Sequence, residues 1–231
     1  MQQLDRRLQT VFSMVRAGRI VADIGTDHGY LSAALLEQKI CPKVYACDVN
    51  EGPLKAAVGT LSAFDSSSWH AILSDGLEQV PTDAEDLVIA GMGGEVIAGI
   101  LERGKKFFSP EKRWILQPQS KHEKLRTYLA QNGFLIEKEQ AVTEREKIYT
   151  VMLCAYTGEK RSIGEMRAWF GEHLHNKNDP ESAAYLEKRA ALLRQMIDGS
   201  IRAQHLSKDD RNRLKNAQRI LEEYQTLSFS L

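Results

Sequence analysis

The chain has 231 residues and is 42% hydrophobic, and its 31 Lys and Arg residues balance its 31 Asp and Glu residues. This length and hydrophobic content are typical of a globular protein with one sizeable domain and an appendage, and they exclude a disordered chain. The zero net charge argues against a non-specific nucleic-acid coat, although it allows a local basic patch.

Helical and extended patterns alternate along the first 158 residues. The chain opens with a predicted helix, residues 4–15, whose apolar side chains recur on one side. Extended apolar segments follow at 19–25, 43–49, 69–77, 86–94 and 113–118. Helical patterns come after four of them, at 30–39, 51–64, 95–108 and 120–133. Strands that alternate with helices predict an α/β domain with a parallel sheet and right-handed crossovers.

The end of this region breaks the alternation. Residues 134–144 and 147–156 are both extended, and a short charged turn joins them without a helix. This pattern predicts a hairpin and therefore an antiparallel last pair of strands. A parallel sheet that ends in this way is the Rossmann-like layout of class I methyltransferases, whereas a dinucleotide-binding domain would continue with a helix.

The composition changes from residue 159 onward, so we expect two domains, 1–158 and 159–231. Helix-start patterns occur at 162–165, 179–180 and 207–210. Apolar residues then recur at heptad-like spacing in the last two segments. These patterns predict a small all-α domain built on an antiparallel, coiled-coil-like helical hairpin.

Four signals stand at the ends of successive predicted strands, where an open α/β sheet places its ligand. The first is a glycine loop that leads into a helix, where the backbone can approach a ligand and free N–H groups are available. The second is an acid 25 residues after Asp23, the spacing expected of a partner for ribose hydroxyls. An Asp-Gly pair and the GMGG segment are the third and fourth. The sequence therefore predicts a nucleoside-type cofactor bound by Asp23, Gly25, Thr26, Gly29, Asp48, Val49, Asp75, Gly76 and Gly91.

Charge indicates which cofactor this is. A dinucleotide carries a pyrophosphate, which an extra acid at position 27 would repel. S-adenosyl-L-methionine has no phosphate, and its ammonium and sulfonium groups are both cationic. Asp23 and Asp27 therefore favour S-adenosyl-L-methionine over NAD. A structural role for Asp23, as a cap of N–H groups in the loop, stays open.

Several stretches together resemble one family. They are RLQTV, ADIGTDHGYL, DGLE, IAGMGGEVIAGILERG and LQPQ. Over its whole length the chain resembles the bacterial tRNA (adenine-22-N1)-methyltransferases, often called TrmK. The resemblance implies transfer of a methyl group from S-adenosyl-L-methionine to N1 of an adenine in tRNA, with Asp27 as an acid important for catalysis. One departure is Gln119, where the family usually has Asn.

The expected chemistry needs alignment more than proton transfer, because N1 of adenine already has a lone pair. Methylation makes the purine cationic, so we expect Asp27 to stabilise the growing charge or to accept a proton from N6. The target edge is hidden in a paired base, so the adenine has to be unpaired or flipped out. We expect substrate contacts from Arg7, His28, Met92, Gly93, Gly94, Lys105, Lys106 and Gln119.

The C-terminal domain carries cations that are candidates for an RNA clamp. They are Arg202, Lys208, Arg211, Arg213 and Lys215. A solvated helix face is the alternative for each of them taken singly. Three other functions stay open: a methyltransferase for a small molecule or protein, a non-catalytic RNA-binding factor with this fold, and an NAD-dependent dehydrogenase, which Asp27 and the terminal hairpin disfavour.

The remaining patterns bound the environment of the protein. No apolar run approaches the roughly 20 residues of a membrane helix, and the N-terminus has no signal-peptide pattern. The histidines show no metal-ligand spacing, so no metal is expected. Three cysteines without a CxxC pair are typical of a reduced cytoplasmic protein. We expect tRNA as the partner and no stable protein partner; the oligomeric state is not indicated.

Overall fold

The computed structural model describes residues 3–203 and 205–229. Contacts within it divide the chain into two compact units, Met1–Ser162 and Ile163–Leu231. The division falls four residues (162 minus 158) after the boundary expected from composition. Each unit has its own hydrophobic core.

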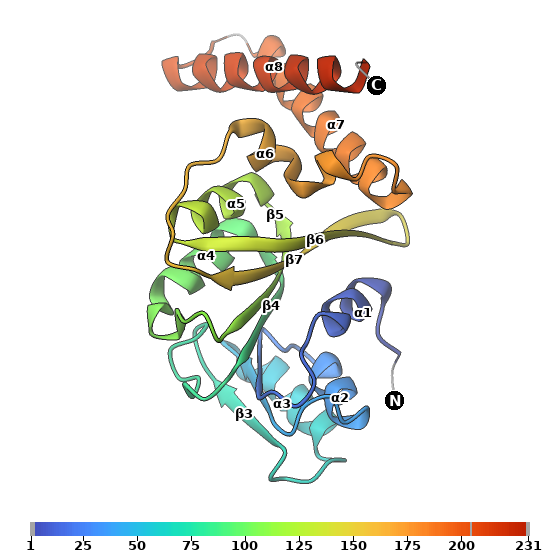
Figure 1. Ribbon diagram of the computed structural model, residues 1–231, viewed down its shortest axis with the longest axis vertical. Coiled ribbons are helices and arrows are strands. Elements are labelled where there is room, and N and C mark those ends of the chain that lie inside the picture. The colour runs from blue at the N-terminus through green and yellow to red at the C-terminus, as the bar shows by residue number, and fades with distance from the viewer. Residues whose placement is uncertain (1–2, 204, 230–231) are drawn as a thin grey trace. The chain divides into compact units, whose positions relative to one another are not determined.

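The first unit is built on a seven-stranded sheet in the order β3-β2-β1-β4-β5-β7-β6 (Figure 1). Five neighbouring strands are parallel, namely β1 (Val21–Ile24), β2 (Val44–Asp48), β3 (Trp69–Leu73), β4 (Asp86–Gly93) and β5 (Arg113–Ser120). The hairpin of β6 (Phe134–Glu144) and β7 (Lys147–Tyr156) completes the sheet, and β7 lies antiparallel between β5 and β6. The predicted Rossmann-like methyltransferase layout is confirmed.

Buried side chains of the central strands alternate between two cores, one on each face of the sheet. On β4, Leu87 and Ile89 belong to one core and Val88 to the other. The first core is covered by α4 (Gly94–Arg103), the short η1 (Lys105–Phe107) and α5 (His122–Gln131). The second core is covered by α1 (Arg6–Ser13), α2 (Tyr30–Glu37) and α3 (Glu51–Leu61). Because both faces are covered, the central strands read as continuous apolar runs rather than as alternating ones.

Helix α1 is held at its start by polar groups. The Oδ1 of Asp5, the N-cap residue, accepts a hydrogen bond from the amide of Leu8 at 2.7 Å. The amide of Arg6 donates to Glu144, and its guanidinium donates to the carbonyl of Thr143, both at 2.9 Å. These bonds fasten α1 beside the β6–β7 hairpin (Figure 1).

The second unit consists of α6 (Glu165–Phe170), η2 (Gly171–His175), α7 (Pro180–Arg202) and α8 (Lys208–Phe229). Asp179 caps α7 as predicted, accepting from the amide of Ser182 at 2.8 Å. The predicted start at 207–210 is confirmed by the amide of Asp210, which donates to the Ser207 hydroxyl. The predicted capping box at 162–165 is wrong, because the N-cap of α6 is Gly164, which has no side chain to cap the helix. The expected all-α composition of this unit is confirmed.

Candidate active site

The loop between β1 and α2 has a backbone that side chains rarely allow. Gly25, Asp27 and Gly29 have positive φ angles of 75°, 54° and 71°. The amides of Gly25 and Thr26 both donate to the carbonyl of Cys47 on β2, at 2.8 and 2.9 Å. A Cβ at Gly29 would lie 3.1 Å from the backbone of Ala57. The loop is thus drawn tightly over the ends of β1 and β2, and glycine is required at its close approach to α3.

Asp23 stabilises this loop through hydrogen bonds. Its side chain is buried, and its Oδ2 accepts from the hydroxyls of Thr26 and Ser32, both at 2.8 Å. Burial raises the pKa of the Asp23 carboxyl and is the largest influence on it. The hydrogen bonds from Ser32 and Thr26 lower this pKa by less, and repulsion from Asp48 raises it further. Asp23 therefore has a structural role, but through the hydroxyls of Thr26 and Ser32 rather than as the expected cap of N–H groups in the loop.

Asp48 connects the loop to the end of β2. Its Oδ2 accepts from the amide of Asp27 at 3.3 Å, and its Oδ1 accepts from the amide of Asn50 at 3.0 Å. The residue is 8% exposed, whereas the adjacent Val49 is 59% exposed. A carboxylate beside an exposed apolar side chain suits a ligand that has both hydroxyl groups and a flat ring.

The side chain of Asp27 points away from these bonds. It is 72% exposed, and its Oδ1 lies 3.7 Å from Nε2 of His28. The His28 ring stacks on the Tyr30 ring with their centroids 5.4 Å apart and their planes within 9°. An acid that is exposed and held in a left-handed backbone can meet an incoming cationic group without first losing an ion pair in the core.

The Asp75–Gly76 turn follows β3. Gly76 is left-handed, with φ of 60°, and a Cβ there would lie 2.9 Å from the Ile100 side chain on α4. The carboxylate of Asp75 accepts from Arg103 at 2.9 Å, and the Arg103 Nε lies 3.7 Å from Glu78. A ligand amino group that used the Asp75 carboxylate would therefore share it with Arg103, a partner that the sequence did not reveal.

The GMGG segment ends β4 with a bulge. The β4–β5 register shifts between Ala90 and Met92, so Gly91 falls out of the ladder, with φ of 81°. A Cβ at Gly25 would lie 2.3 Å from Cε of Met92, which places the Met92 side chain over the first glycine of the loop. Gly94 packs against the backbone of Lys121, where a Cβ would come within 2.4 Å of the carbonyl oxygen. The bulge thus brings the ends of β1, β4 and β5 together.

Two residues predicted to contact substrate meet over Gly91, which is exposed. A Cβ at Gly91 would lie 3.8 Å from Nε2 of Gln119 and 3.9 Å from Nη1 of Arg7. Gln117 was not predicted as part of the site, yet its buried amide oxygen accepts from both Arg7 and the Gly91 amide. A glutamine directly after the apolar run 114–116 was the sequence signal that could have found it, because a polar side chain at a buried strand position needs a hydrogen-bond partner.

This site can be compared with known proteins. A family model described as a methyltransferase domain matches residues 4–152. The tRNA (adenine(22)-N(1))-methyltransferase of Bacillus subtilis is 34% identical over 172 residues, which cover 70% of this chain and 72% of that protein. The chain belongs to the tRNA (adenine(22)-N(1))-methyltransferase family.

Solved structures agree with this assignment. A Streptococcus pneumoniae protein, solved in complex with S-adenosyl-L-methionine, is 28% identical with a TM-score of 0.79, and the match covers 95% of this chain and 100% of that chain. The Bacillus subtilis M1A22 tRNA methyltransferase TrmK has a TM-score of 0.86 at 24% identity, with 98% of this chain and 99% of that chain covered. The second likeness shows the fold that this methyltransferase family shares.

Lys105 and Lys106 lie apart from the glycine loop and the GMGG segment, on the side of the Asp75–Gly76 turn. They follow α4, a helix of 10 residues that starts at the GMGG end and spans about 15 Å. The ammonium group of Lys105 pairs with Glu102, and that of Lys106 donates to the carbonyl of Glu78 at 2.8 Å. The structure therefore does not bring these lysines together with the glycine loop of the methyltransferase domain.

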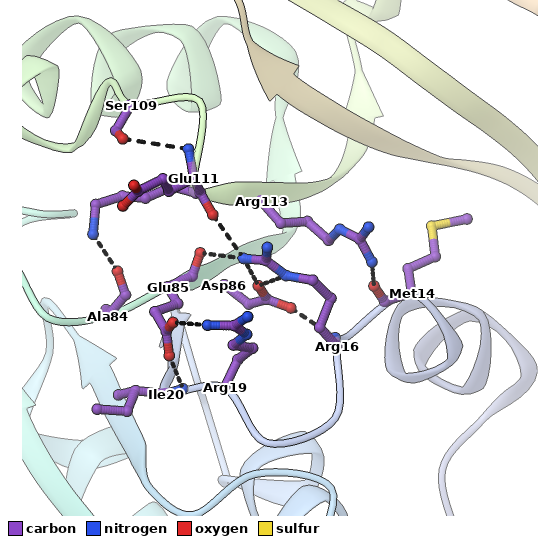
Figure 2. A network of polar contacts seen from close by, with 11 residues as sticks. Met14, Arg16, Arg19, Ile20, Ala84, Glu85, Asp86, Ser109, Glu111 and Arg113 are labelled. Atoms are coloured by element: carbon purple, nitrogen blue, oxygen red, sulfur yellow. Dashed lines mark hydrogen bonds and ion pairs between the residues drawn. The ribbon is translucent and has the colours of Figure 1, made fainter.

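A second polar cluster lies at the amino-terminal ends of β4 and β5, opposite the strand ends that carry the glycine loop (Figure 2). Arg16 binds the fully buried Asp86 through its backbone amide and Nε, both at 2.7 Å. Arg19 pairs with Glu85 at 2.5 Å. A cavity of about 420 Å³ is lined by Arg16, Arg19, Glu85, Glu111 and Lys112. These mutual contacts tie the segment after α1 to the sheet, a structural role in this methyltransferase.

Within the residues that the structure describes, no cluster of three or more potential metal ligands is present. In the same part of the chain, no helix combines the length and apolarity needed to cross a membrane. The three cysteines are free thiols and buried.

Proposed function

We propose that this protein transfers the methyl group of S-adenosyl-L-methionine to N1 of adenine 22 in tRNA. The observation that carries the proposal is the pair Asp27 and Asp48, which one backbone hydrogen bond joins at the ends of adjacent parallel strands. The pair lies beside a glycine loop with left-handed residues, in a chain of the tRNA (adenine(22)-N(1))-methyltransferase family. Acids beside this loop fit a cationic methyl donor and would repel the pyrophosphate of a dinucleotide.

The donor supplies, when bound, a methyl group on a positively charged sulfur. Asp48 would accept hydrogen bonds from the ribose hydroxyls, and Val49 and the Asp75–Gly76 turn would hold the adenine ring. Thr26 and the glycines 25, 29 and 91 let the backbone come close to the methionine part. Asp23 contributes chiefly by holding the loop, because its Oδ2 already accepts from two hydroxyls.

Asp27 acts on the acceptor base. N1 of adenine attacks with its own lone pair, so the protein has to align the base and counter the positive charge that forms on it. The exposed Asp27 carboxylate is available for this, and a base stacked over the loop would cover it from water and strengthen its effect. The same carboxylate is placed to accept a proton from N6.

The acceptor adenine enters beside the bulged end of β4. Gly93 presents no side chain there, and Met92 and Gly94 flank it, although Gly94 itself packs against the Lys121 backbone. Gln119 and His28 offer an amide and an imidazole to the base edge, and Arg7 offers a cation to the RNA. The amide at position 119 can replace the family asparagine with one extra methylene of reach. Lys105 and Lys106, away from this opening, stay a prediction as contacts to more distant phosphates.

The helical unit supplies further cations for tRNA. Arg202, Lys208, Arg211, Arg213 and Lys215 are exposed or partly exposed on α7 and α8. Their charge attracts the RNA backbone without reading sequence. We place the protein in the cytoplasm on the ground that its substrate is tRNA.

Methylation of a tRNA transcript tests the proposal directly. The purified chain is incubated with S-adenosyl-L-methionine and a transcript that has adenine at position 22, and the product is mapped by primer extension, which N1-methyladenine blocks. A transcript with guanine at position 22 is the control. A stop at position 22 in the first transcript alone is expected. No methylation of the first transcript, by a chain that calorimetry shows to bind S-adenosyl-L-homocysteine, would refute the tRNA substrate.

A further inference from the structure

Gln117 lies where β5 meets the bulge of β4. Its side chain is fully buried, and it pairs with Ala90, the last residue before the register shift. Its Nε2 donates to the carbonyl of Pro118 at 2.9 Å. This bond orients the amide, because it directs Nε2 toward Pro118 and leaves Oε1 pointing toward β4 and α1.

The oxygen of this amide accepts two hydrogen bonds. The Gly91 amide, which the bulge takes out of the ladder, donates to Oε1 at 3.1 Å. Nη1 of Arg7 donates to the same oxygen at 3.0 Å. One buried oxygen therefore holds both the backbone of the GMGG segment and a guanidinium that comes from a helix more than a hundred residues away in the chain.

Arg7 contacts three groups, of which only Asp5 is charged, and that ion pair is long and partly exposed. Gln117 is neutral, the Tyr149 ring lies 5.9 Å from the guanidinium carbon, and Asp5 is 3.5 Å from Nη2 and partly exposed. A guanidinium has five N–H donors, so it can keep these contacts and still bind an anion. The side chain of Arg7 is 17% exposed, so only a small part of it is accessible to a ligand.

We propose that Gln117 is a positioning residue that sets Arg7 for the tRNA phosphate next to the target adenine. The inference rests on the proposed function. The methylated base becomes cationic, so a guanidinium would oppose the reaction if it faced the base. A phosphate beside the flipped nucleotide is the anion that a planar guanidinium binds best. A glutamate at position 117 would neutralise Arg7, whereas a glutamine orients it and leaves its charge for the RNA.

A double-mutant cycle on the full chain tests this assignment. Arg7→Ala, Gln117→Leu and the double variant are compared with the wild type by the KM for a tRNA transcript. We expect each single change to raise KM about tenfold, the size of one hydrogen bond to a charged group. In the double variant, Gln117→Leu should add less than about twofold to the effect of Arg7→Ala, because the two residues act as one unit. Fold changes that multiply would overturn the proposal.

Two controls separate positioning from general damage. The affinity for S-adenosyl-L-homocysteine, measured by calorimetry, should stay within about twofold in Arg7→Ala, which loses only the RNA contact. Gln117→Leu also removes the acceptor of the Gly91 amide, so its role toward Arg7 is read from the coupling in the double variant. Arg6 is one residue away on α1 and donates to Thr143 instead. The fold changes in KM caused by Arg6→Ala and Gln117→Leu should therefore multiply in the double variant, as for independent residues. Coupling of Arg6 to Gln117 as strong as that of Arg7 would overturn the assignment.

Gln117→Glu covers the case in which the leucine variant does not fold. It keeps the volume of the side chain and an acceptor oxygen toward Arg7. Because the new carboxylate would neutralise Arg7, we expect a raised KM for tRNA. This increase should not occur when Arg7 has already been replaced by Ala. An unchanged KM would contradict the proposal. A wild-type chain that methylates no tRNA would refute the proposed function itself, which the wild-type measurement shows before any variant is made.

Discussion

Asp48 holds the backbone of Asp27, since its Oδ2 accepts from the Asp27 amide at 3.3 Å while the Asp27 side chain stays exposed. Asp48 thus holds the loop in place, while Asp27 is the acid whose side chain the loop exposes to solvent. The φ of 54° at Asp27 is a conformation that Asn and Asp adopt more readily than other residues with side chains. Aspartate at this position therefore supplies a carboxylate in a turn that otherwise calls for glycine.

Asp27→Asn should lower kcat for tRNA methylation about a hundredfold, because it removes the charge that stabilises the cationic product. Asparagine tolerates the same left-handed backbone, so the loop and its bond to Asp48 should persist. Affinity for S-adenosyl-L-homocysteine, measured by calorimetry, reports whether they do. Turnover equal to that of the wild type would remove the electrostatic role of Asp27.

Gly25→Ala should weaken binding of S-adenosyl-L-homocysteine, because its new Cβ would come within 2.3 Å of the Met92 side chain and displace it. The matched control is Gly18→Ala, whose φ of 76° is the same but whose Cβ meets nothing within 4 Å. Both variants should lose about 1 kcal/mol of stability from the left-handed backbone. Only the first should lose affinity; an equal loss in both would mean that backbone strain, not the site, is responsible.

Asp23 should make the folded state less stable as pH rises. Burial raises its pKa above the ordinary value of 3.8, so the folded chain binds more protons than the unfolded chain from about pH 4 up to that raised pKa. Stability from this group therefore falls with rising pH through that window. Asp23→Asn should gain stability relative to the wild type over the same range, as measured by urea unfolding at a series of pH values.

Asp65→Asn is the control of opposite sign. Bonds from Ser67 lower the pKa of Asp65, so its contribution is present above pH 3.8 and is lost as pH falls below that value. The variant should therefore be the less stable form at neutral pH, with a difference that disappears in acid. A difference between Asp23→Asn and the wild type that does not change with pH would contradict the assigned pKa direction.

The buried pair of Arg126 and Glu139 should be costly to break. Nη2 of Arg126 lies 2.8 Å from Oε1 of Glu139, and the two side chains are 1% and 0% exposed. Arg126→Met would leave a buried carboxylate without this partner, at a cost of about 3–5 kcal/mol in the free energy of unfolding. Lys55→Met, in the exposed pair with Glu51, should cost less than about 1 kcal/mol. Urea unfolding of both variants measures the contrast.

The cations of the helical unit should act on tRNA affinity through salt. Replacing Lys208, Arg211 and Lys215 together by Gln should weaken tRNA binding and reduce the slope of log affinity against log salt concentration by about two to three. Affinity for S-adenosyl-L-homocysteine should be unaffected. The control is a variant in which three lysines of the first unit, Lys39, Lys43 and Lys55, are replaced by Gln. Equal slopes for the two triple variants would rule out a specific clamp in the helical unit.

Much of the fold was predictable because side-chain periodicity reports burial directly. The runs of β1 and β2 are buried throughout, and β4 is buried over its first four residues, as a sheet covered on both faces requires. The missing helix between residues 144 and 147 was enough to predict the antiparallel end of the sheet. The capping box predicted at 162–165 failed because a residue pattern does not specify which backbone group begins the helix.

The site was predictable only where its residues follow strands. Asp23, Asp48 and the glycines at 25, 29 and 91 could be grouped from the sequence because the carboxyl ends of parallel strands meet at one end of a sheet, and their contact with the cofactor stays a prediction. The separation of Lys105 and Lys106 from that end could not be predicted, since it depends on the direction of α4. The pairing of Asp75 with Arg103 likewise depends on how α4 packs against the turn after β3.

The order of apolar runs, glycines and acids by itself determined an α/β methyltransferase fold and favoured a cationic methyl donor, while the catalytic role of Asp27 stays a prediction. Only the tertiary structure decided that Gln117 joins Arg7 to Gly91, a contact across 110 residues that needs the β4 bulge and the docking of α1. Local patterns record which face of an element is buried. They do not record register or bulges, because these arise only when strands far apart in the chain pair.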